Sequence, residues 1–161
     1  MPPFIYPGTF DPITNGHVDL TRRACGLFGA ITFAIAASPG KKPMFSVEQR
    51  VALTRKVFAA EDLPVEVIGF EGLLVDLVQR LKARVIIRGL RAISDYEYEL
   101  QLANTNRVLL PSVETLFLTP AVEFAYISST MVREIATLGG DVGALVHPLV
   151  QRELRKRSAT A

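Results

Sequence analysis

Five short apolar runs recur along this chain, and each segment between them is long enough to form a helix. The runs occupy residues 4–6, 31–37, 65–68, 85–87 and 115–118. This alternation is typical of a parallel sheet, because two parallel strands need a crossover connection between them. The runs show little polar alternation, so helices should cover both faces of the sheet. The sequence therefore predicts a doubly wound α/β fold with a parallel sheet.

The segments between the runs carry apolar residues at spacings of three and four, which predicts helices. These helices span residues 18–28, 47–60, 73–81, 95–108 and 130–138. Ser46 stands directly before the second helix and is a suitable N-cap. The sequence G-G-D at 139–141 predicts a turn before a last helical stretch from Asp141, with a break at 147–148. We expect a single domain over residues 1–161, with a helical tail from about residue 141.

The composition is that of an ordinary globular domain. The chain has 161 residues, of which 49% are hydrophobic and 21% charged, and this length suits one domain with a substantial core. Neither an uncharged apolar span of membrane length nor a signal-peptide arrangement is visible. We therefore expect a cytoplasmic protein that does not contact membranes. The single cysteine, Cys25, excludes an internal disulfide and should be buried or half-buried in a helix.

The charge pattern favours a small polyanionic ligand. The net charge of +2 is too small to indicate binding to nucleic acid, and the one basic run, at 152–157, lies in the last helical stretch. The other basic residues of interest stand singly in turns that follow the apolar runs. That dispersal suits a small phosphorylated molecule better than a duplex backbone.

Most of the candidate site residues follow a predicted strand. Thr9 and His17 follow the first run, Lys41 and Lys42 the second, Leu74 the third, Arg88 and Arg91 the fourth, and Ser128, Ser129 and Thr130 the fifth. Because the carboxyl ends of parallel strands meet at one edge of a sheet, these positions can form one site. Taken singly, each has a simpler interpretation: the lysines as a solvated loop, the arginines as rim charges, and the hydroxyls as a helix cap.

Residues 9–17 have the order expected of a phosphate site, with a strand before them and a helix after. A helix N-terminus offers unpaired backbone N–H groups, and Gly8 and Gly16 let the backbone approach an anion closely. His17 adds a side-chain donor in the first helical turn. In the alternative interpretation the glycines only shape a tight loop, Asp11 caps an ordinary turn, and His17 is a surface residue.

Two motifs of this chain resemble the signatures of the nucleotidylyltransferase superfamily. T-N-G-H at 14–17 resembles T-x-G-H, and I-S-S-T-M-V-R at 127–133 resembles I-S-S-T-x-x-R. The segments Y-P-G-T-F-D-P at 6–12, A-S-P-G-K-K-P-M-F at 37–45 and I-R-G-L-R at 87–91 are similar to those of the bacterial phosphopantetheine adenylyltransferase family. The resemblance runs from about residue 4 to about residue 146 and implies a Rossmann-like fold with five parallel strands.

The resemblance also implies a reaction, the transfer of the adenylyl group of ATP to 4′-phosphopantetheine, which gives 3′-dephospho-coenzyme A and pyrophosphate. The attacking phosphate is already anionic, so no protein nucleophile is needed. The site has to hold two polyanions in line and neutralise the charge that builds up on phosphorus. A site of cations, hydroxyls and helix N-termini suits this task.

The resemblance gives each matching residue a role. His17 would bind the ATP phosphates and stabilise the transition state, with Lys41 and Arg91 as further catalytic residues. The acceptor would contact Thr9, Lys41, Leu74, Arg88 and Asn106. ATP would contact Thr9, Phe10, His17, Gly89, Leu90, Arg91, Tyr98, Glu99, Phe124, Ala125, Tyr126, Ile127, Ser128, Ser129 and Thr130. The sequence F-A-Y at 124–126 departs from the Trp-containing stretch of some family members.

The family also implies a metal ion and partners. Mg²⁺ would bind mainly through the ATP phosphates, because the sequence has no clustered carboxylates with ligand spacing. Coenzyme A is a feedback ligand to be considered, and relatives of this kind form homohexamers. The apolar stretch at 109–111 and the C-terminal helix are candidates for subunit contacts.

Two other functions compete with this one. A nucleotidylyltransferase of the same fold could use nicotinate mononucleotide or a polyol phosphate as acceptor, although the segments at 37–45 and 87–91 argue against it. A regulatory module could bind nucleotides without catalysis, although His17 and the basic residues are intact. Tyr96, Tyr98 and Glu99 could also be packing or surface residues, and Leu74 could belong to the core.

Overall fold

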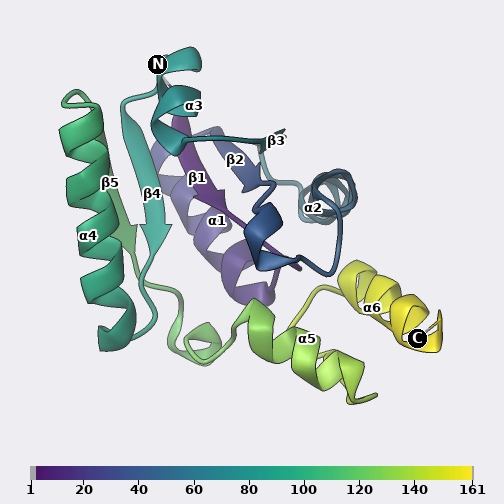
Figure 1. Ribbon diagram of the computed structural model, residues 1–161. Coiled ribbons are helices and arrows are strands. Elements are labelled where there is room, and N and C mark those ends of the chain that lie inside the picture. The colour runs from purple at the N-terminus through teal and green to yellow at the C-terminus, as the bar shows by residue number, and fades with distance from the viewer. Residues whose placement is uncertain (1–2, 161) are drawn as a thin grey trace.

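Five strands form one parallel sheet in the computed structural model, which describes residues 3–160 (Figure 1). The strands are β1 (Phe4–Gly8), β2 (Ile31–Ala36), β3 (Val65–Phe70), β4 (Val85–Gly89) and β5 (Glu114–Leu118). They lie in the order β3-β2-β1-β4-β5, and every neighbouring pair is parallel. The predicted fold class is confirmed. The winding direction reverses between β1 and β4, and doubly wound sheets bind ligands at the carboxyl ends of the strands at such a point.

Helices connect the strands and cover the sheet. They are α1 (Asn15–Phe28), α2 (Val47–Ala60), α3 (Leu74–Arg80), α4 (Ile93–Leu109), α5 (Ser129–Thr137) and α6 (Pro148–Thr160), with short 3-10 turns η1 (Pro39–Lys41) and η2 (Val122–Phe124). Helices α1, α2, α5 and α6 contribute to one hydrophobic cluster and α3 to a second. Helix α4 packs against β5 and α3, as Figure 1 shows at the edge of the sheet.

The two clusters lie on opposite faces of the sheet because successive strand residues point to opposite sides. On the first face, Phe33 is fully buried and packs edge-on against Tyr6 and Phe58. On the second face, Ile5 and Ile86 are fully buried and belong to the cluster of α3. The sheet is therefore covered on both faces, as the weak polar alternation of its strands predicts.

Helix α1 begins at Asn15, three residues earlier than the apolar pattern predicts. The side chain of Thr14 accepts a hydrogen bond from the His17 backbone N–H, and the His17 side chain accepts one from the Thr14 backbone N–H. This reciprocal arrangement is a capping box, which fixes the start of a helix. Gly16 and His17 consequently belong to the first helical turn. The predicted cap of α2 is confirmed, since Ser46 caps a helix that begins at Val47.

The C-terminal segment differs from its prediction. A helix from Asp141 was expected, but residues 141–147 form turns and α6 begins at Pro148, where a break was expected. Proline suits the first position of a helix, because its backbone needs no N–H there and its φ is already helical. His147 precedes it and accepts a hydrogen bond from the Leu149 backbone N–H, which caps the new helix.

Helix α6 is part of the domain, because Val150 and Leu154 are buried in the first core cluster. Cys25 is half-buried in α1, as predicted. Among residues 3–160, no helix is both long and apolar enough to span a membrane.

Candidate active site

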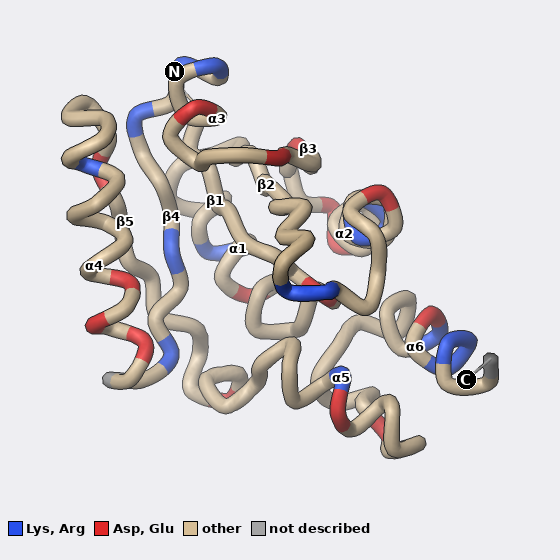
Figure 2. Tube along the Cα trace, in the orientation of Figure 1, with Lys and Arg blue, Asp and Glu red and all other residues tan. Residues whose placement is uncertain are grey.

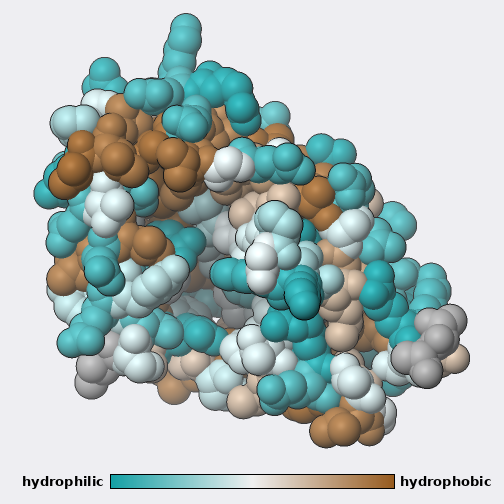
Figure 3. Space-filling model, viewed as in Figure 1, coloured by the Kyte–Doolittle hydropathy of each residue, from teal (hydrophilic) through white to brown (hydrophobic). Residues whose placement is uncertain are grey.

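A cavity of about 370 Å³ opens at the carboxyl ends of β1 and β4, the point where the winding direction reverses. Figure 3 shows it as a hollow bordered mainly by hydrophilic side chains. Most of the site residues predicted from the sequence line it. They are Thr9, Phe10, His17, Lys41, Arg88, Gly89, Arg91, Glu99, Phe124, Ile127, Ser128, Ser129 and Thr130. The topology thus gathers residues that lie up to 121 positions apart into one site.

Six predicted residues lie outside the cavity lining. Leu74 packs against the core cluster of α3, and Leu90 continues the sheet by donating its backbone N–H to the Leu118 carbonyl. Tyr98 and Tyr126 are 61% exposed. The others are Asn106, which is half-buried on α4, and Ala125, which follows η2. Their assigned contacts with the acceptor and with ATP remain predictions.

The capping box of α1 fixes the imidazole of His17. The Thr14 backbone N–H donates to Nδ1 over 3.0 Å, and the Thr14 hydroxyl lies 3.1 Å from the same nitrogen. Because a backbone N–H can only donate, Nδ1 is an acceptor and the proton of the neutral ring is on Nε2. The ring also packs edge-on against Phe10, with centroids 4.9 Å apart. His17 therefore offers the cavity an oriented Nε2–H donor.

The surroundings keep this imidazole neutral. Burial, together with the positive charges of Arg91 and Arg88, lowers the pKa of His17 to about 3. Burial also raises the pKa of Tyr6, whose ring lies beneath the cavity, well above its ordinary value. In the ligand-free site His17 is thus a neutral hydrogen-bond donor and not a cation.

Two arginines that follow β4 are held by carboxylates. Arg88 makes a bidentate ion pair with Glu99, in which Nε donates over 2.7 Å and Nη2 over 2.5 Å. Its Nη1 donates to the Pro7 carbonyl. The Arg91 side chain donates to Asp95 over 3.3 Å and to the Ile127 carbonyl over 2.9 Å. Both guanidinium groups consequently keep fixed orientations before any ligand arrives.

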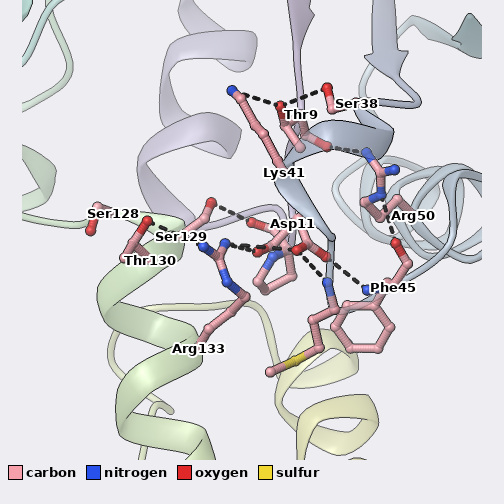
Figure 4. A network of polar contacts seen from close by, with 12 residues as sticks. Thr9, Asp11, Ser38, Lys41, Phe45, Arg50, Ser128, Ser129, Thr130 and Arg133 are labelled. Carbon is pink, nitrogen blue, oxygen red and sulfur yellow. Dashed lines mark hydrogen bonds and ion pairs between the residues drawn. The ribbon is translucent and has the colours of Figure 1, made fainter. Parts of the chain in front are cut away.

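Lys41 is held far less tightly. Its ammonium lies 3.4 Å from the hydroxyl of Thr9, which is 3.2 Å from the hydroxyl of Ser38. Lys41 is exposed at the end of η1, in the loop that follows β2. Figure 4 shows its side chain reaching from this loop toward the loop that follows β1.

Asp11 has a structural role that the sequence left open. It is 3% exposed, and its two carboxylate oxygens accept the backbone N–H groups of Met44 and Phe45 over 2.7 and 2.9 Å. Nη1 of Arg133 donates to the Asp11 carbonyl and lies 3.8 Å from its carboxylate. The carboxylate of Asp11 therefore joins its turn to a loop 33 residues away, whereas the alternative interpretation expected a cap on the turn itself.

The segment 127–133 combines two roles. Ser128 caps α5 by accepting the Met131 backbone N–H, and Ser129 donates to the Pro12 carbonyl over 2.8 Å. Thr130 accepts a hydrogen bond from Arg133. The interpretation of these hydroxyls as a helix cap is thus correct for Ser128, yet all three also line the cavity.

The cavity is electrostatically suited to anions. Within the described part of the chain, four cationic side chains line it, Lys41, Arg88, Arg91 and Arg133, against three acidic ones, Asp11, Asp95 and Glu99. The N-termini of α1 and α5 also open onto it, and each adds a positive dipole end. In Figure 2 basic segments mark the loop after β2 and the end of β4, while acidic segments mark the first half of α4.

Two glycines make room for this arrangement. A Cβ on Gly8 would lie 2.7 Å from the ring of Phe10, and a Cβ on Gly89 would lie 2.8 Å from Cδ1 of Leu20. Either contact is far closer than van der Waals packing allows. Both strands that border the cavity must therefore end without a side chain.

A parallel sheet with a ligand cavity at its reversal point is the arrangement of doubly wound α/β proteins. The family model described as cytidylyltransferase-like matches residues 5–135. A solved structure shares the fold, the nicotinic acid mononucleotide adenylyltransferase of Plasmodium falciparum complexed with NaAD. It has a TM-score of 0.73 at 18% identity, over 96% of this chain and 94% of the other. The protein is thus a nucleotidyltransferase by class.

Curated relatives identify the particular family. The phosphopantetheine adenylyltransferase of Nitrosospira multiformis is 56% identical over 157 residues, which cover 97% of this chain and 94% of the relative. That of Hahella chejuensis is 57% identical over 156 residues, which cover 96% of each chain. The chain belongs to the phosphopantetheine adenylyltransferase family.

Proposed function

We propose that this enzyme transfers the adenylyl group of ATP to 4′-phosphopantetheine, giving 3′-dephospho-coenzyme A and pyrophosphate in coenzyme A biosynthesis. The relatives named for this activity are 56% and 57% identical over nearly the full chain. The observation that carries the chemistry is the cavity itself, where three loops and two helix N-termini bring cations and oriented donors together.

The reaction is a direct in-line displacement. An oxygen of the acceptor phosphate attacks the α-phosphorus of ATP and forms a new P–O bond. The bond from the α-phosphorus to the bridging oxygen of the β-phosphate breaks, and the electron pair leaves with pyrophosphate. The attacking oxygen is already ionised, so no general base is required.

The engaged side chains of the cavity support a mechanism without a covalent intermediate. The Nδ1 of His17 is an acceptor for Thr14, and the carboxylates of Asp11 and Glu99 are already filled by donors. The enzyme therefore acts by positioning and by charge stabilisation. His17 donates through Nε2–H to oxygens that gain negative charge in the transition state, and Lys41 and Arg91 act beside it.

The cavity divides between the two substrates. Lys41 and Thr9 bind the phosphate of 4′-phosphopantetheine from the β1 and β2 loops, with Arg88 on the opposite wall. Arg91, the end of β4 and residues 127–130 bind ATP. The Arg91 contact with the Ile127 carbonyl supports this division, because it joins the two loops that border the nucleotide.

Magnesium fits this site only as a partner of the substrate. The cavity lining has one more cationic than acidic side chain, which is too little to neutralise a triphosphate together with a second phosphate. Among residues 3–160, no group of three or more His, Cys, Asp or Glu side chains could hold a metal ion. We propose that Mg²⁺ binds through the ATP phosphates, where it lowers the charge of the triphosphate.

We further propose a cytoplasmic homohexamer that coenzyme A inhibits. Exposed apolar side chains support assembly, since Leu100, Val108 and Leu109 of α4 and Leu116 of β5 are 38 to 80% exposed. Figure 3 shows hydrophobic surface over the upper part of α4. Coenzyme A shares its pantetheine arm with the acceptor and its nucleotide with the product, so it fits the same cavity. Light scattering of the purified protein tests for six chains, and added coenzyme A tests inhibition.

Pyrophosphate release tests the proposed reaction. The purified protein is supplied with ATP, Mg²⁺ and either 4′-phosphopantetheine or nicotinate mononucleotide. We expect release with 4′-phosphopantetheine only. Release with the nucleotide alone would overturn the assigned acceptor and keep the reaction class, and the absence of release with both would favour a binding module.

A further inference from the structure

Arg50 of α2 is a buried cation that binds backbone carbonyls. It is 1% exposed, and among residues 3–160 it makes four hydrogen bonds, none of them to a carboxylate. Nη1 donates to the carbonyls of Thr9 and Ala36 over 2.7 Å each, Nη2 donates to that of Ala37 over 3.0 Å, and Nε donates to that of Phe45 over 3.0 Å. A single guanidinium thus joins the loop after β1 to both ends of the loop after β2.

The carbonyls that Arg50 binds adjoin strained backbone. Phe10 and Ser38 have φ of 48° each, in the left-handed region that L residues rarely adopt. The Thr9 carbonyl belongs to the peptide that precedes Phe10, and the Ala37 carbonyl belongs to the peptide that precedes Ser38. Strained conformations persist only where surrounding contacts hold them. Arg50 supplies such a contact to both peptides.

Asp11 completes the arrangement from the other side. Its carboxylate binds the N–H groups of Met44 and Phe45, while Arg50 binds the Phe45 carbonyl. Figure 4 shows Arg50 on one side of Phe45 and Asp11 on the other, with Thr9 and Lys41 beyond them. The loop 38–45 is therefore fastened at its start and its end, and Lys41 lies on the part between.

We propose that Arg50 is a positioning residue for the acceptor phosphate. It acts through the backbone, by setting the distance between Thr9 and Lys41, the two residues to which the proposed function gives that phosphate. The inference rests on that proposed function. Arg50 is not among the residues that line the cavity, so its effect has to pass through the loops.

The geometry predicts an effect on one substrate. The carbonyls that Arg50 binds belong to residues 9, 36, 37 and 45, all on the side of Lys41. The other wall of the cavity is fixed by separate contacts, Arg91 with Asp95 and Ile127. Loss of the guanidinium fork should therefore weaken binding of the acceptor far more than binding of ATP.

The test compares Arg50→Lys with Arg55→Lys in the full-length enzyme. Lysine keeps the charge of arginine and most of its length but lacks its planar fork, so it cannot bind four carbonyls at once. Arg55 is a matched control, because it lies on the same helix and donates to the Val67 carbonyl over 2.7 Å, away from the cavity lining. KM for 4′-phosphopantetheine and KM for ATP are measured for wild type and both variants, together with Tm.

We expect Arg50→Lys to raise KM for 4′-phosphopantetheine by about tenfold or more while KM for ATP changes by less than about threefold, as displaced positioning groups do. Arg55→Lys should leave both constants near wild type. A double variant with Lys41→Ala should show less than the product of the two single effects on the acceptor KM, because Arg50 acts through Lys41.

Several outcomes would overturn the inference. The first is an equal rise in KM for both substrates. The second is a lower Tm with unchanged KM values. The third is an acceptor KM of the double variant that rises by the full product of the two single effects. If Arg50→Lys is recovered only as aggregate, Arg50→Gln provides the same comparison, and failure of both variants to fold would make Arg50 a folding residue. A wild-type enzyme without turnover would refute the proposed function instead, so the two failures are distinguishable.

Discussion

The neutral state of His17 makes a quantitative prediction about stability in acid. The pKa of His17 is lowered from 6.5 to about 3 in the folded protein, first by burial and then by Arg91 and Arg88. The unfolded chain, in which the imidazole regains its ordinary pKa, binds more protons between these two values. The free energy of unfolding therefore falls as the pH is lowered through this window.

The size of the effect follows from the pKa difference. Each unit of pKa is equivalent to about 1.36 kcal/mol, so lowering the pH from about 6.5 to about 4.5 removes roughly 2 to 3 kcal/mol through His17. The variant His17→Gln lacks this titration. Glutamine should keep the capping box, because Gln49 accepts the N-cap backbone N–H at the matching position of α2.

The titration of His17 should separate the two proteins along the pH axis. Near pH 7.5 the two proteins should have similar free energies of unfolding, and near pH 4.5 His17→Gln should be the more stable by roughly 2 to 3 kcal/mol. Urea unfolding followed by circular dichroism at both pH values measures the difference, and carboxylates that titrate in both proteins cancel from it. Because the chain has only 2 histidines, comparison of the two proteins by NMR also identifies the His17 resonances. A stability difference that stays constant with pH, or a His17 resonance that titrates near pH 6.5, would refute the reasoning.

Three further predictions follow from single contacts. Lys41→Ala removes a charged contact to the acceptor phosphate and should raise the acceptor KM by about 10- to 100-fold. Pyrophosphate release measures this KM, and an unchanged KM would exclude Lys41 from the binding site of the acceptor phosphate. Asp11→Ala leaves two backbone N–H groups without their acceptor and should lower the free energy of unfolding by about 2 to 4 kcal/mol, measured in urea. Gly89→Ala places a Cβ 2.8 Å from a side-chain carbon of α1 and should cost about 1 to 3 kcal/mol. The control is Gly26→Ala, where a Cβ meets nothing within 4 Å, and this change should stabilise the protein by up to about 1 kcal/mol. Equal melting temperatures for the two variants would contradict the steric argument.

The sheet could be predicted from the sequence because its strands are short, apolar and separated by helical patterns. The strand ends were predicted less well. Strand β1 continues through Pro7 and Gly8, which pair with Ala34 and Ile35 of β2, although neither residue belongs to an apolar run. Backbone pairing sets the end of a strand, and a hydrophobic pattern does not record it.

The cavity could be anticipated because its residues follow strands, and parallel strands end at one edge. The burial of Arg50 could not be anticipated, because an arginine on an amphipathic helix is ordinarily solvent-exposed. Its burial depends on carbonyls of residues 9, 36 and 37, which only the folded loops bring to it. The role of Asp11 was left open for the same reason, since its donors lie 33 and 34 residues away.

The contacts of the cationic residues indicate where the enzyme is rigid and where it adapts. Arg88 is held by Glu99, Arg91 by Asp95 and Arg133 by Asp11, so three of the four cations that line the cavity in residues 3–160 keep a carboxylate partner. These groups are preorganised, and a ligand gains from them without reorganising the protein. Lys41 has only a 3.4 Å contact with a hydroxyl and a flexible stem. Conformational adjustment on binding should therefore be concentrated at Lys41, and this is why the loop that carries it needs to be fastened at both ends by Arg50 and Asp11.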